Sequence, residues 1–123
     1  MIYLVSPYTH ADPRVREERF RAACQATAEL MRAGQPTLSP VMFGHLLTEY
    51  NLPGDWSFWA PFATEYLQRC DEVVVLMLDG WQESVGVQAE IRIAEANGTP
   101  VRYVAADQVL SVVNECELQG ERA

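Results

Sequence analysis

The sequence predicts a three-layer α/β sandwich around a parallel sheet of four or five strands. Short apolar runs alternate with helical patterns along the chain, and segment 71–104 shows this most clearly. Its run Glu72–Leu78 is rich in valine, which is typical of a strand buried on both faces. A helical pattern follows, and then a second apolar run. Two strands joined by a helix in this way pair in parallel through a right-handed crossover.

The first part of the chain predicts two strands joined by a long helix. We expect a buried strand at Ile2–Val5, which Ser6-Pro7 ends because proline cannot donate to a strand ladder. Asp12 is a good N-cap for a helix that runs from Pro13 to about Ala33, where Gly34 stops it. Four arginines of this helix are interpreted as a solvated face, namely Arg14, Arg16, Arg19 and Arg21. A second short strand is expected at Gln35–Leu38.

The later elements follow the same alternation. The segment SPVMFGH is expected to be a loop that leads into a short helix at about His45–Tyr50. In chain order we then expect a helix at Trp56–Cys70 that Pro61 starts or kinks, the strand Glu72–Leu78, a helix from Ser84 to Asn97-Gly98, a strand at Thr99–Val104 and a closing helix at Asp107–Leu118.

Composition excludes several classes of protein. The 123 residues, 49% of them hydrophobic, suit a single domain over 1–123 with its own core. A net charge of −8 argues against nucleic acid as a partner, because a polyanion would be repelled. No apolar run reaches the roughly 20 residues of a membrane span. Three cysteines without paired spacing, and a first strand that begins beside Met1, favour a cytoplasmic protein without a signal peptide.

Chemically useful side chains follow the strand ends. Because parallel strands end at one edge of the sheet, we expect a crevice that gathers Tyr3, His10, His45, Ser84 and Glu90. Gly86 leaves room at the start of a helix, where the N–H groups from Ser84 to Val87 favour a small anion such as phosphate. A carboxylate just beyond that anion can act as a nucleophile. From spacing alone, a solvated glutamate is the commoner interpretation of Glu90.

Histidine and tryptophan give weaker signals. His10 and His45 are candidate acids for a leaving group or contacts to a base, and two histidines without a carboxylate cluster predict no metal site. Trp81 and Trp59 can stack on a nucleobase, although large aromatic residues of small domains more often belong to the core.

Three motifs together resemble a known superfamily. The segment SVGVQAE, residues 84–90, resembles the S-x-G-x-x-x-E segment of the nucleoside 2-deoxyribosyltransferase superfamily, which includes deoxynucleoside 5′-monophosphate N-glycosidases. The apolar strand DEVVVLML and the first strand YLVSP occupy matching places. With S-P-x-x-x-x-H added, the chain is most similar to a subgroup of small bacterial and phage proteins known only as deoxyribosyltransferase-like. The resemblance covers nearly the whole chain and implies a Rossmann-like or flavodoxin-like fold.

The resemblance also implies roles for particular residues. Glu90 matches the glutamate that attacks the anomeric carbon and forms a covalent glycosyl-enzyme intermediate. Tyr3 matches the tyrosine that positions this carboxylate or the sugar. Ser84 matches the residue near the 5′ end of the sugar, where serine suits a phosphate. Ser6, Pro7, Gly86, Val87 and the crevice residues then contact a small nucleotide or nucleoside substrate, and no cofactor is implied.

One departure concerns the leaving base. The related hydrolases carry an aspartate eight residues before the position of Asp71, and this chain has Ala63 there. Three acids are candidate substitutes, namely Asp79, Glu65 and Asp55, and Asp79 is preferred because it stands at a strand end. Two classes of function therefore stay open: an N-glycosidase or deoxyribosyltransferase, or a nucleotide-binding module that kept the pocket and lost turnover.

Aromatic residues of one helix predict self-association. Trp56, Phe58, Trp59 and Phe62 are many large rings for a short surface helix, and such patches usually mark interfaces. The family's pockets are completed across a dimer interface, so the resemblance implies a homodimer. The alternative is that these rings fill the core beneath the turn at residues 51–55.

Overall fold

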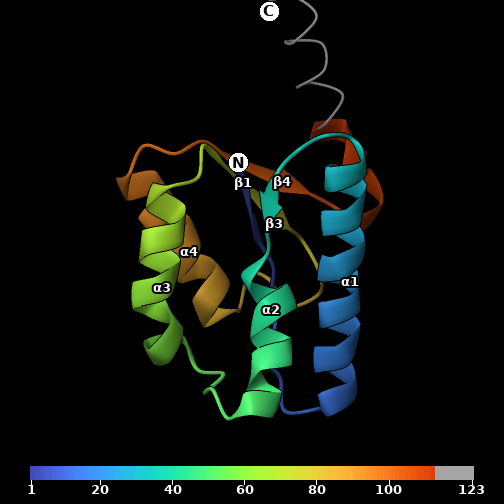
Figure 1. Ribbon diagram of the computed structural model, residues 1–123, viewed down its shortest axis with the longest axis vertical. Helices are drawn as coiled ribbons and strands as arrows, with labels where there is room; N and C mark the ends of the chain where they lie inside the picture. The colour runs from blue at the N-terminus through green and yellow to red at the C-terminus, as the bar shows by residue number, and fades with distance from the viewer. Residues whose placement is uncertain (113–123) are drawn as a thin grey trace, which may run out of the picture.

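The computed structural model describes residues 1–112, and at its centre lies a sheet of four parallel strands (Figure 1). The strands are β1 (Ile2–Val5), β2 (Thr37–Leu38), β3 (Glu72–Leu76) and β4 (Val101–Val104). Their spatial order is β2-β1-β3-β4, so the chain leaves β1 toward one edge and later returns to the other side of β1 with β3. This is a small Rossmann-like three-layer α/β fold, as the sequence predicts.

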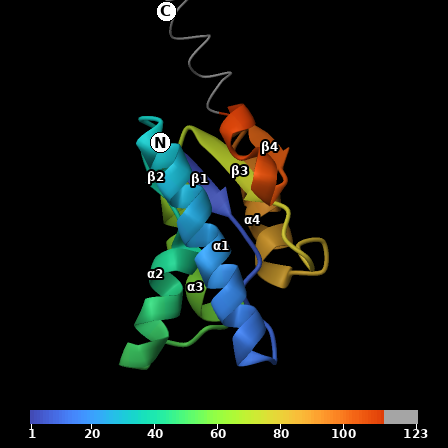
Figure 2. The same ribbon diagram turned by 90° about the vertical axis from the view of Figure 1, so that its right-hand side faces the viewer.

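Helices cover both faces of this sheet, which explains why its central strands are apolar at nearly every position. The helical elements are α1 (Pro13–Arg32), α2 (Pro40–Leu47), α3 (Trp56–Gln68) and α4 (Val85–Ala96), with short 3₁₀ turns η1 (Thr48–Tyr50) and η2 (Ala106–Gln108). In β1, Ile2 and Leu4 join a core cluster with α1, whereas Tyr3 and Val5 join one with α3 and α4. Figure 2 shows α1 on the side of the sheet opposite α4.

The ends of α1 follow their capping residues. The Asp12 carboxylate accepts a hydrogen bond from the Arg14 amide at 2.9 Å, and Pro13 occupies the first turn, where its missing N–H costs nothing. Gly34 takes a positive φ of 85° just after the helix, a conformation that glycine adopts without steric cost. The predicted helix is therefore confirmed to within one residue of its end.

The predicted loop SPVMFGH is wrong, because most of it forms α2. Ser39 caps this helix by accepting a hydrogen bond from the Met42 amide at 3.4 Å, and Pro40 is its first residue. The short helix expected at His45–Tyr50 is the end of α2 followed by η1, which stops at Asn51 with a φ of 68°. The Ser-Pro pair is the same start signal as Asp12-Pro13, but it follows a strand so closely that it was interpreted only as the strand's end.

Three predicted strands are longer than the observed ones. The Ile2 amide donates to the Pro36 carbonyl at 2.9 Å, but Pro36 has no N–H to return, and the ladder of β2 begins one residue later. Pro100 delays the start of β4 for the same reason. A turn from the Leu78 amide to the Leu76 carbonyl, 2.9 Å, ends β3 at Leu76. Helix α3 ends at Gln68 rather than Cys70 and contains Pro61. Most of the predicted helix 107–118 lies outside the described residues.

Candidate active site

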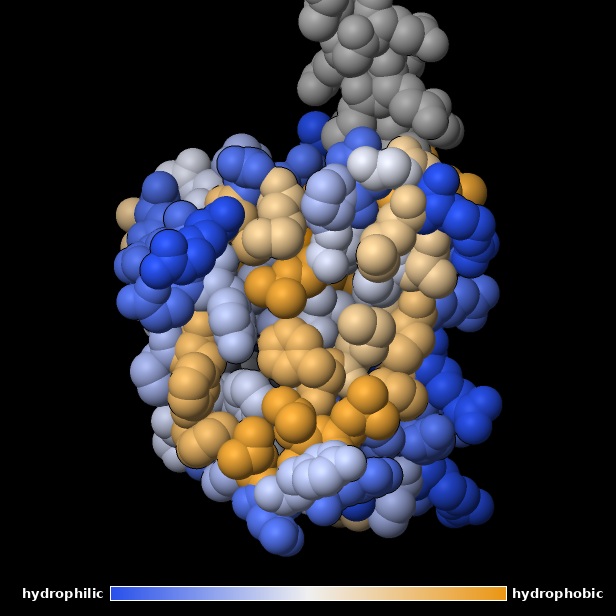
Figure 3. All heavy atoms as spheres, viewed as in Figure 1, coloured by the Kyte–Doolittle hydropathy of each residue, from blue (hydrophilic) through white to orange (hydrophobic). Residues whose placement is uncertain are grey.

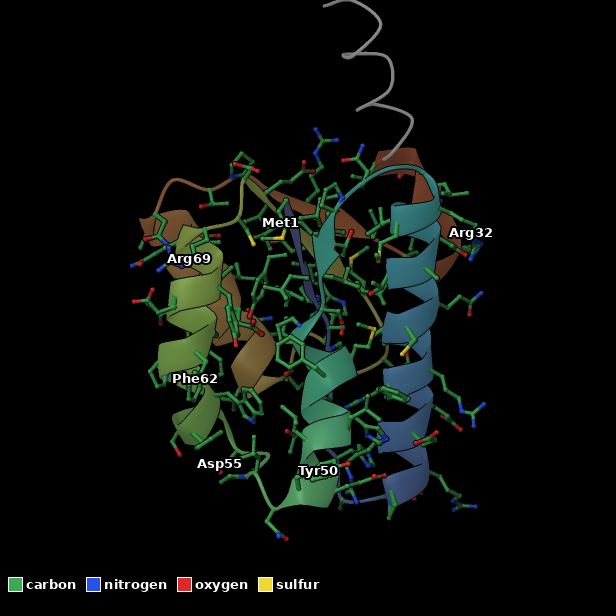
Figure 4. The ribbon with its side chains drawn as sticks, in the orientation of Figure 1. Met1, Arg32, Tyr50, Asp55, Phe62 and Arg69 are labelled. Carbon is green, nitrogen blue, oxygen red and sulfur yellow. The ribbon has the colours of Figure 1, made fainter. Side chains whose placement is uncertain are left out.

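A cavity of about 530 Å³ opens at the carboxyl ends of β1 and β3, the place where the strand order reverses. Its walls come from the loop after β1, from α2, from α3 and from the start of α4. Asp55, which Figure 4 labels where the chain enters α3, belongs to the rim. Open parallel sheets bind ligands in this crevice, and the volume fits a small-molecule site of roughly 300–1,000 Å³.

Tyr3 and Glu90 meet in the floor of this cavity. Tyr3 lies in the middle of β1 and is fully buried, while Glu90 lies on α4, on the face turned toward the sheet. The Tyr3 hydroxyl donates a hydrogen bond to the Glu90 carboxylate. Burial raises the pKa of Glu90 to about 7, although the Tyr3 hydrogen bond acts in the opposite direction. Burial and the neighbouring Glu90 raise the pKa of Tyr3, so its hydroxyl stays a donor.

The start of α4 forms the polar end of the cavity. Ser84 is the N-cap, and its Oγ accepts a hydrogen bond from the Val87 amide at 3.2 Å. The Ser84 hydroxyl proton is therefore left to donate into the cavity, together with the first-turn amides of Val85 and Gly86, which lack an acceptor among residues 1–112. Ser6 also lines the cavity, and its buried Oγ has no partner in the described part of the chain. These groups suit an oxyanion.

A row of three side chains lies in another wall. The Tyr8 hydroxyl is 2.6 Å from Nδ1 of His45, and Nε2 of His45 is 3.0 Å from a carboxylate oxygen of Glu17. Phe20 stacks on the His45 ring, with centroids 4.1 Å apart and planes inclined by 22°. Tyr8 and His45 line the cavity, while Glu17 of α1 stands behind them. The row joins the loop after β1, α2 and α1.

Aromatic rings from α3 form the apolar wall. Trp56, Trp59 and Tyr66 line the cavity, and Nε1 of Trp59 donates to the Pro53 carbonyl at 2.8 Å. Ala63 lies in the same wall and is 5% exposed, at the position where the resemblance implies an aspartate. The wall therefore offers flat apolar surface, on which a nucleobase can stack, without a carboxylate at that position.

Two predicted site residues lie in a neighbouring cavity instead. His10 and Asp79 line a second hollow on the α1 side, and neither lines the cavity of Glu90. The cause is Arg19, whose guanidinium donates to the carbonyls of Thr9 and Asp79, both at 2.9 Å. Because β3 ends early, Asp79 lies on a loop that Arg19 holds toward α1. Arg19 therefore stays partly exposed, as a solvated face predicts, but it also ties the loops after β1 and β3 to α1.

Pro7 and Trp81 are also placed outside the cavity wall. Pro7 is fully buried behind the end of β1. Trp81 packs on the core cluster of α3 and α4 and on Tyr103, with ring centroids 5.7 Å apart. The predicted residues that the structure does gather around one cavity are Tyr3, Ser6, His45, Asp55, Trp59, Ser84, Gly86, Val87 and Glu90.

Sequence reasoning missed Tyr8, Glu17 and Trp56. Tyr8 directly follows the first-strand segment YLVSP, and this place just after a strand end is a usable signal. Glu17 was hidden among the charges of α1, because its pairing with His45 depends on how α2 packs against α1. Across residues 1–112, no group of three or more His, Cys, Asp or Glu side chains is arranged to hold a metal ion. None of the helices in that range is long and apolar enough to cross a membrane.

The fold is that of a small doubly wound α/β domain with a cavity at the switch point of its sheet. Residues 1–106 match the model of the family described as "Domain of unknown function (DUF1937)", and the chain belongs to this family. A search of curated proteins found no match.

Proposed function

We propose that this protein cleaves the N-glycosidic bond of a nucleoside or deoxynucleoside 5′-monophosphate through a covalent glutamyl-sugar intermediate. The observation that carries the proposal is the Tyr3–Glu90 pair in the floor of a nucleotide-sized cavity. Because the pKa of Glu90 is about 7, a substantial fraction of the carboxylate is ionised at neutral pH. A partly desolvated carboxylate held by one donor is well suited to attack carbon.

In this reaction an oxygen of Glu90 bonds to the anomeric carbon while the bond from that carbon to the base nitrogen breaks. The base leaves with the bonding electron pair and takes up a proton. Water then attacks the same carbon and gives up a proton, which balances the one taken up by the base; this step breaks the bond to Glu90, regenerates the carboxylate and releases the sugar phosphate. A second base in place of water gives transfer. Tyr3 holds the carboxylate in one orientation, which lowers the entropic cost of attack.

The polar end of the cavity supports a 5′-phosphate on the substrate. Ser84 and the free amides of Val85 and Gly86 lie there, and the Ser6 hydroxyl lines the same cavity, while the exposed carboxylate of Glu83 is the one negative group beside Ser84 in the chain. A helix N-terminus favours negative charge, and charge-assisted hydrogen bonds are about twice as strong as neutral ones. No arginine lines this cavity in the described part of the chain, so recognition would depend on neutral donors.

The second candidate is a nucleotide-binding module without turnover. Ala63 favours it, because the cavity wall lacks an acid at the position where related hydrolases have aspartate. Binding without release of base distinguishes this candidate from the enzyme.

The test is a screen of nucleoside 5′-monophosphates in which free base is measured by chromatography. We expect release from at least one of them, and Glu90→Gln should lower the rate by at least about a thousand-fold while the protein still folds. Glu95→Gln is the matched control, since Glu95 is an exposed glutamate on the same helix. A folded Glu90→Gln protein with the rate of wild type would rule out the nucleophile, and tight binding without turnover would favour the binding module.

A further inference from the structure

The row formed by Tyr8, His45 and Glu17 has no role in the steps described so far. Its two links, 2.6 Å and 3.0 Å, are short enough for protons to be shared along it. His45 is held from both ring nitrogens and by the stacked Phe20, so its orientation is fixed. Tyr8 and His45 line the cavity, whereas Glu17 does not. The hydrogen-bonded row therefore leads from Glu17 on α1, through His45, to the Tyr8 hydroxyl at the cavity.

The reaction needs an acid, because the departing base must gain a proton. Ala63 cannot supply one, and Asp79 lines the other hollow. Asp55 is on the rim, but the hydrogen bond from the Ser57 hydroxyl lowers the pKa of its carboxyl and keeps it ionised. Glu65 is exposed and pairs with Arg69 at 3.2 Å. Glu83 also lines the cavity, but it is exposed, and no second group of the described chain holds or resupplies it. The hydroxyl of Tyr8 is the acid of the cavity lining that a second group, His45, can resupply.

We propose that Tyr8 donates the proton to the leaving base, and that His45 and Glu17 position and reprotonate it; this inference rests on the proposed function. With His45 doubly protonated, Nε2–H donates to Glu17 and Nδ1–H donates to the Tyr8 oxygen, which turns the Tyr8 proton toward the cavity. As the glycosidic bond breaks, the base nitrogen takes that proton, and the Nδ1 proton moves to the Tyr8 oxygen. His45 is left neutral and is reprotonated from water before the next turnover.

The surroundings of Tyr8 keep it in the phenol form until that moment. Burial is the main cause that raises the pKa of Tyr8, and Glu17 adds to it, while Arg16 acts in the opposite direction. Arg16 is itself held by the His10 carbonyl on the loop after β1. The phenol is therefore a weak acid in the free protein, and it becomes a useful donor only when the leaving group gains negative charge as it departs.

The test compares two leaving groups on the same sugar phosphate. One substrate carries a nucleobase, which needs a proton; the other carries 4-nitrophenolate, which leaves without one. Tyr8→Phe should lose about a hundred-fold or more on the nucleotide, the scale of general acid catalysis, and less than about five-fold on the nitrophenyl substrate. Tyr103→Phe, which changes a tyrosine that is 45% exposed and does not line this cavity, is the control and should match wild type on both. Equal losses on both substrates, or none, would overturn the role of Tyr8.

Testing Glu17 and His45 as positioning residues requires a measurement that would not change if these side chains only stabilised the fold. Glu17→Gln and His45→Gln should show the same selective loss on the nucleotide, smaller than that of Tyr8→Phe. The chain has only two histidines, so ¹⁵N-labelled imidazole signals of His45 are assigned by His10→Gln. We expect these signals to shift in Tyr8→Phe and in Glu17→Gln, and unchanged signals in both variants would overturn the relay.

The two proposals fail in different ways. If wild type releases neither base nor nitrophenolate, the glycosidase function is wrong, and the histidine signals alone decide whether the row exchanges protons. If wild type is active and Tyr8→Phe keeps its full rate on the nucleotide, the glycosidase function stands and the relay is wrong.

Discussion

Glu90 makes the stability of this protein depend on pH. Its pKa is about 7 in the folded chain against an ordinary value of 4.5, so between these values the folded state binds more protons than the unfolded state. Stability should therefore fall as pH rises through this window and stay low above it, by on the order of 1–3 kcal/mol. The carboxyl keeps partial access to the cavity, which reduces the penalty. Glu90→Gln should be more stable than wild type at pH 8.

Urea unfolding at pH 4 and pH 8 measures this difference. At pH 4 the glutamic acid is neutral and resembles glutamine, so the two proteins should have equal free energies of unfolding. Glu95→Gln should not show the same change, because Glu95 is exposed. A Glu90→Gln protein that is less stable than wild type at pH 8 would contradict a strained carboxylate. A buried ionised carboxylate that lowers the stability of the fold is typical of groups kept for function rather than for stability.

Single residues differ in how well the sequence predicts them. Glu90, Tyr3 and Ser84 were predicted as a set, because strand and helix registers fix their places and the resemblance supplied their roles. Asp79 was preferred as the acid from its place in the chain alone. Its separation from Glu90 depends on a bond that Arg19 makes from a distant helix, and no local pattern encodes that.

At the scale of elements, Gly86 at the start of α4 has two separable effects, one on the stability of the helix and one on the proposed binding of a phosphate. A Cβ built on Gly86 would meet its nearest atom, on the Trp56 ring, at 3.8 Å, an ordinary contact. Gly86→Ala should therefore fold normally and gain a few tenths to about 1 kcal/mol of stability, because alanine is the better helix former. Thermal unfolding should show no loss.

The same substitution should damage the anion site. We expect Gly86→Ala to weaken the binding of a nucleoside monophosphate, because the added methyl group stands where a phosphate would approach the first-turn amides. The inactive Glu90→Gln protein with Gly86 intact should bind the monophosphate more tightly than the nucleoside by about 1.5–3 kcal/mol, measured by calorimetry. This gap should shrink in the Gly86→Ala version. Equal affinities of the Glu90→Gln protein for nucleoside and nucleotide would contradict the proposed recognition of a phosphate.

Elements were predicted well where two signals agreed. Helix α1 has a cap, a first-turn proline and a terminal glycine, and its bounds were nearly right. Helix α2 has the cap and the proline as well, but its apolar sequence contains Gly44 and it has no fully buried residue. An amphipathic pattern was therefore missing, and a loop was preferred. The helix matters, since it carries His45 into the cavity wall.

For the whole molecule, the parallel sheet was predictable but the strand order was not. Alternating strands and helices imply parallel pairing, whereas the order β2-β1-β3-β4 depends on the side of β1 that β3 takes. That order creates the switch point and hence the cavity. The separation of the two hollows, one on each side of the loops after β1 and β3, follows from the same arrangement.

One face of the molecule carries a group of exposed apolar side chains. Figure 3 shows hydrophobic side chains gathered over α2 and toward α3, and three of the exposed apolar residues here are Leu46, Tyr50 and Phe62, which are 49%, 75% and 43% exposed. Figure 4 shows Tyr50 and Phe62 on the two sides of the segment that carries Asp55. Apolar patches of this kind usually mark interfaces, and a two-fold dimer is the commonest way to cover one. The same elements form two walls of the cavity, so a partner copy would lie beside it.

We therefore expect a dimer at micromolar concentration in light scattering, and Phe62→Glu should convert it to a monomer. Trp59 is a poorer probe, because it lines the cavity and its replacement would alter the site directly. Met31→Glu is the control: Met31 is 59% exposed but lies near the end of α1. Each chain carries a net charge of −8, so the two copies repel and added salt should strengthen the dimer. A wild-type monomer at these concentrations would contradict the interface, and the rings of α3 would then serve only the cavity wall and the packing beneath it.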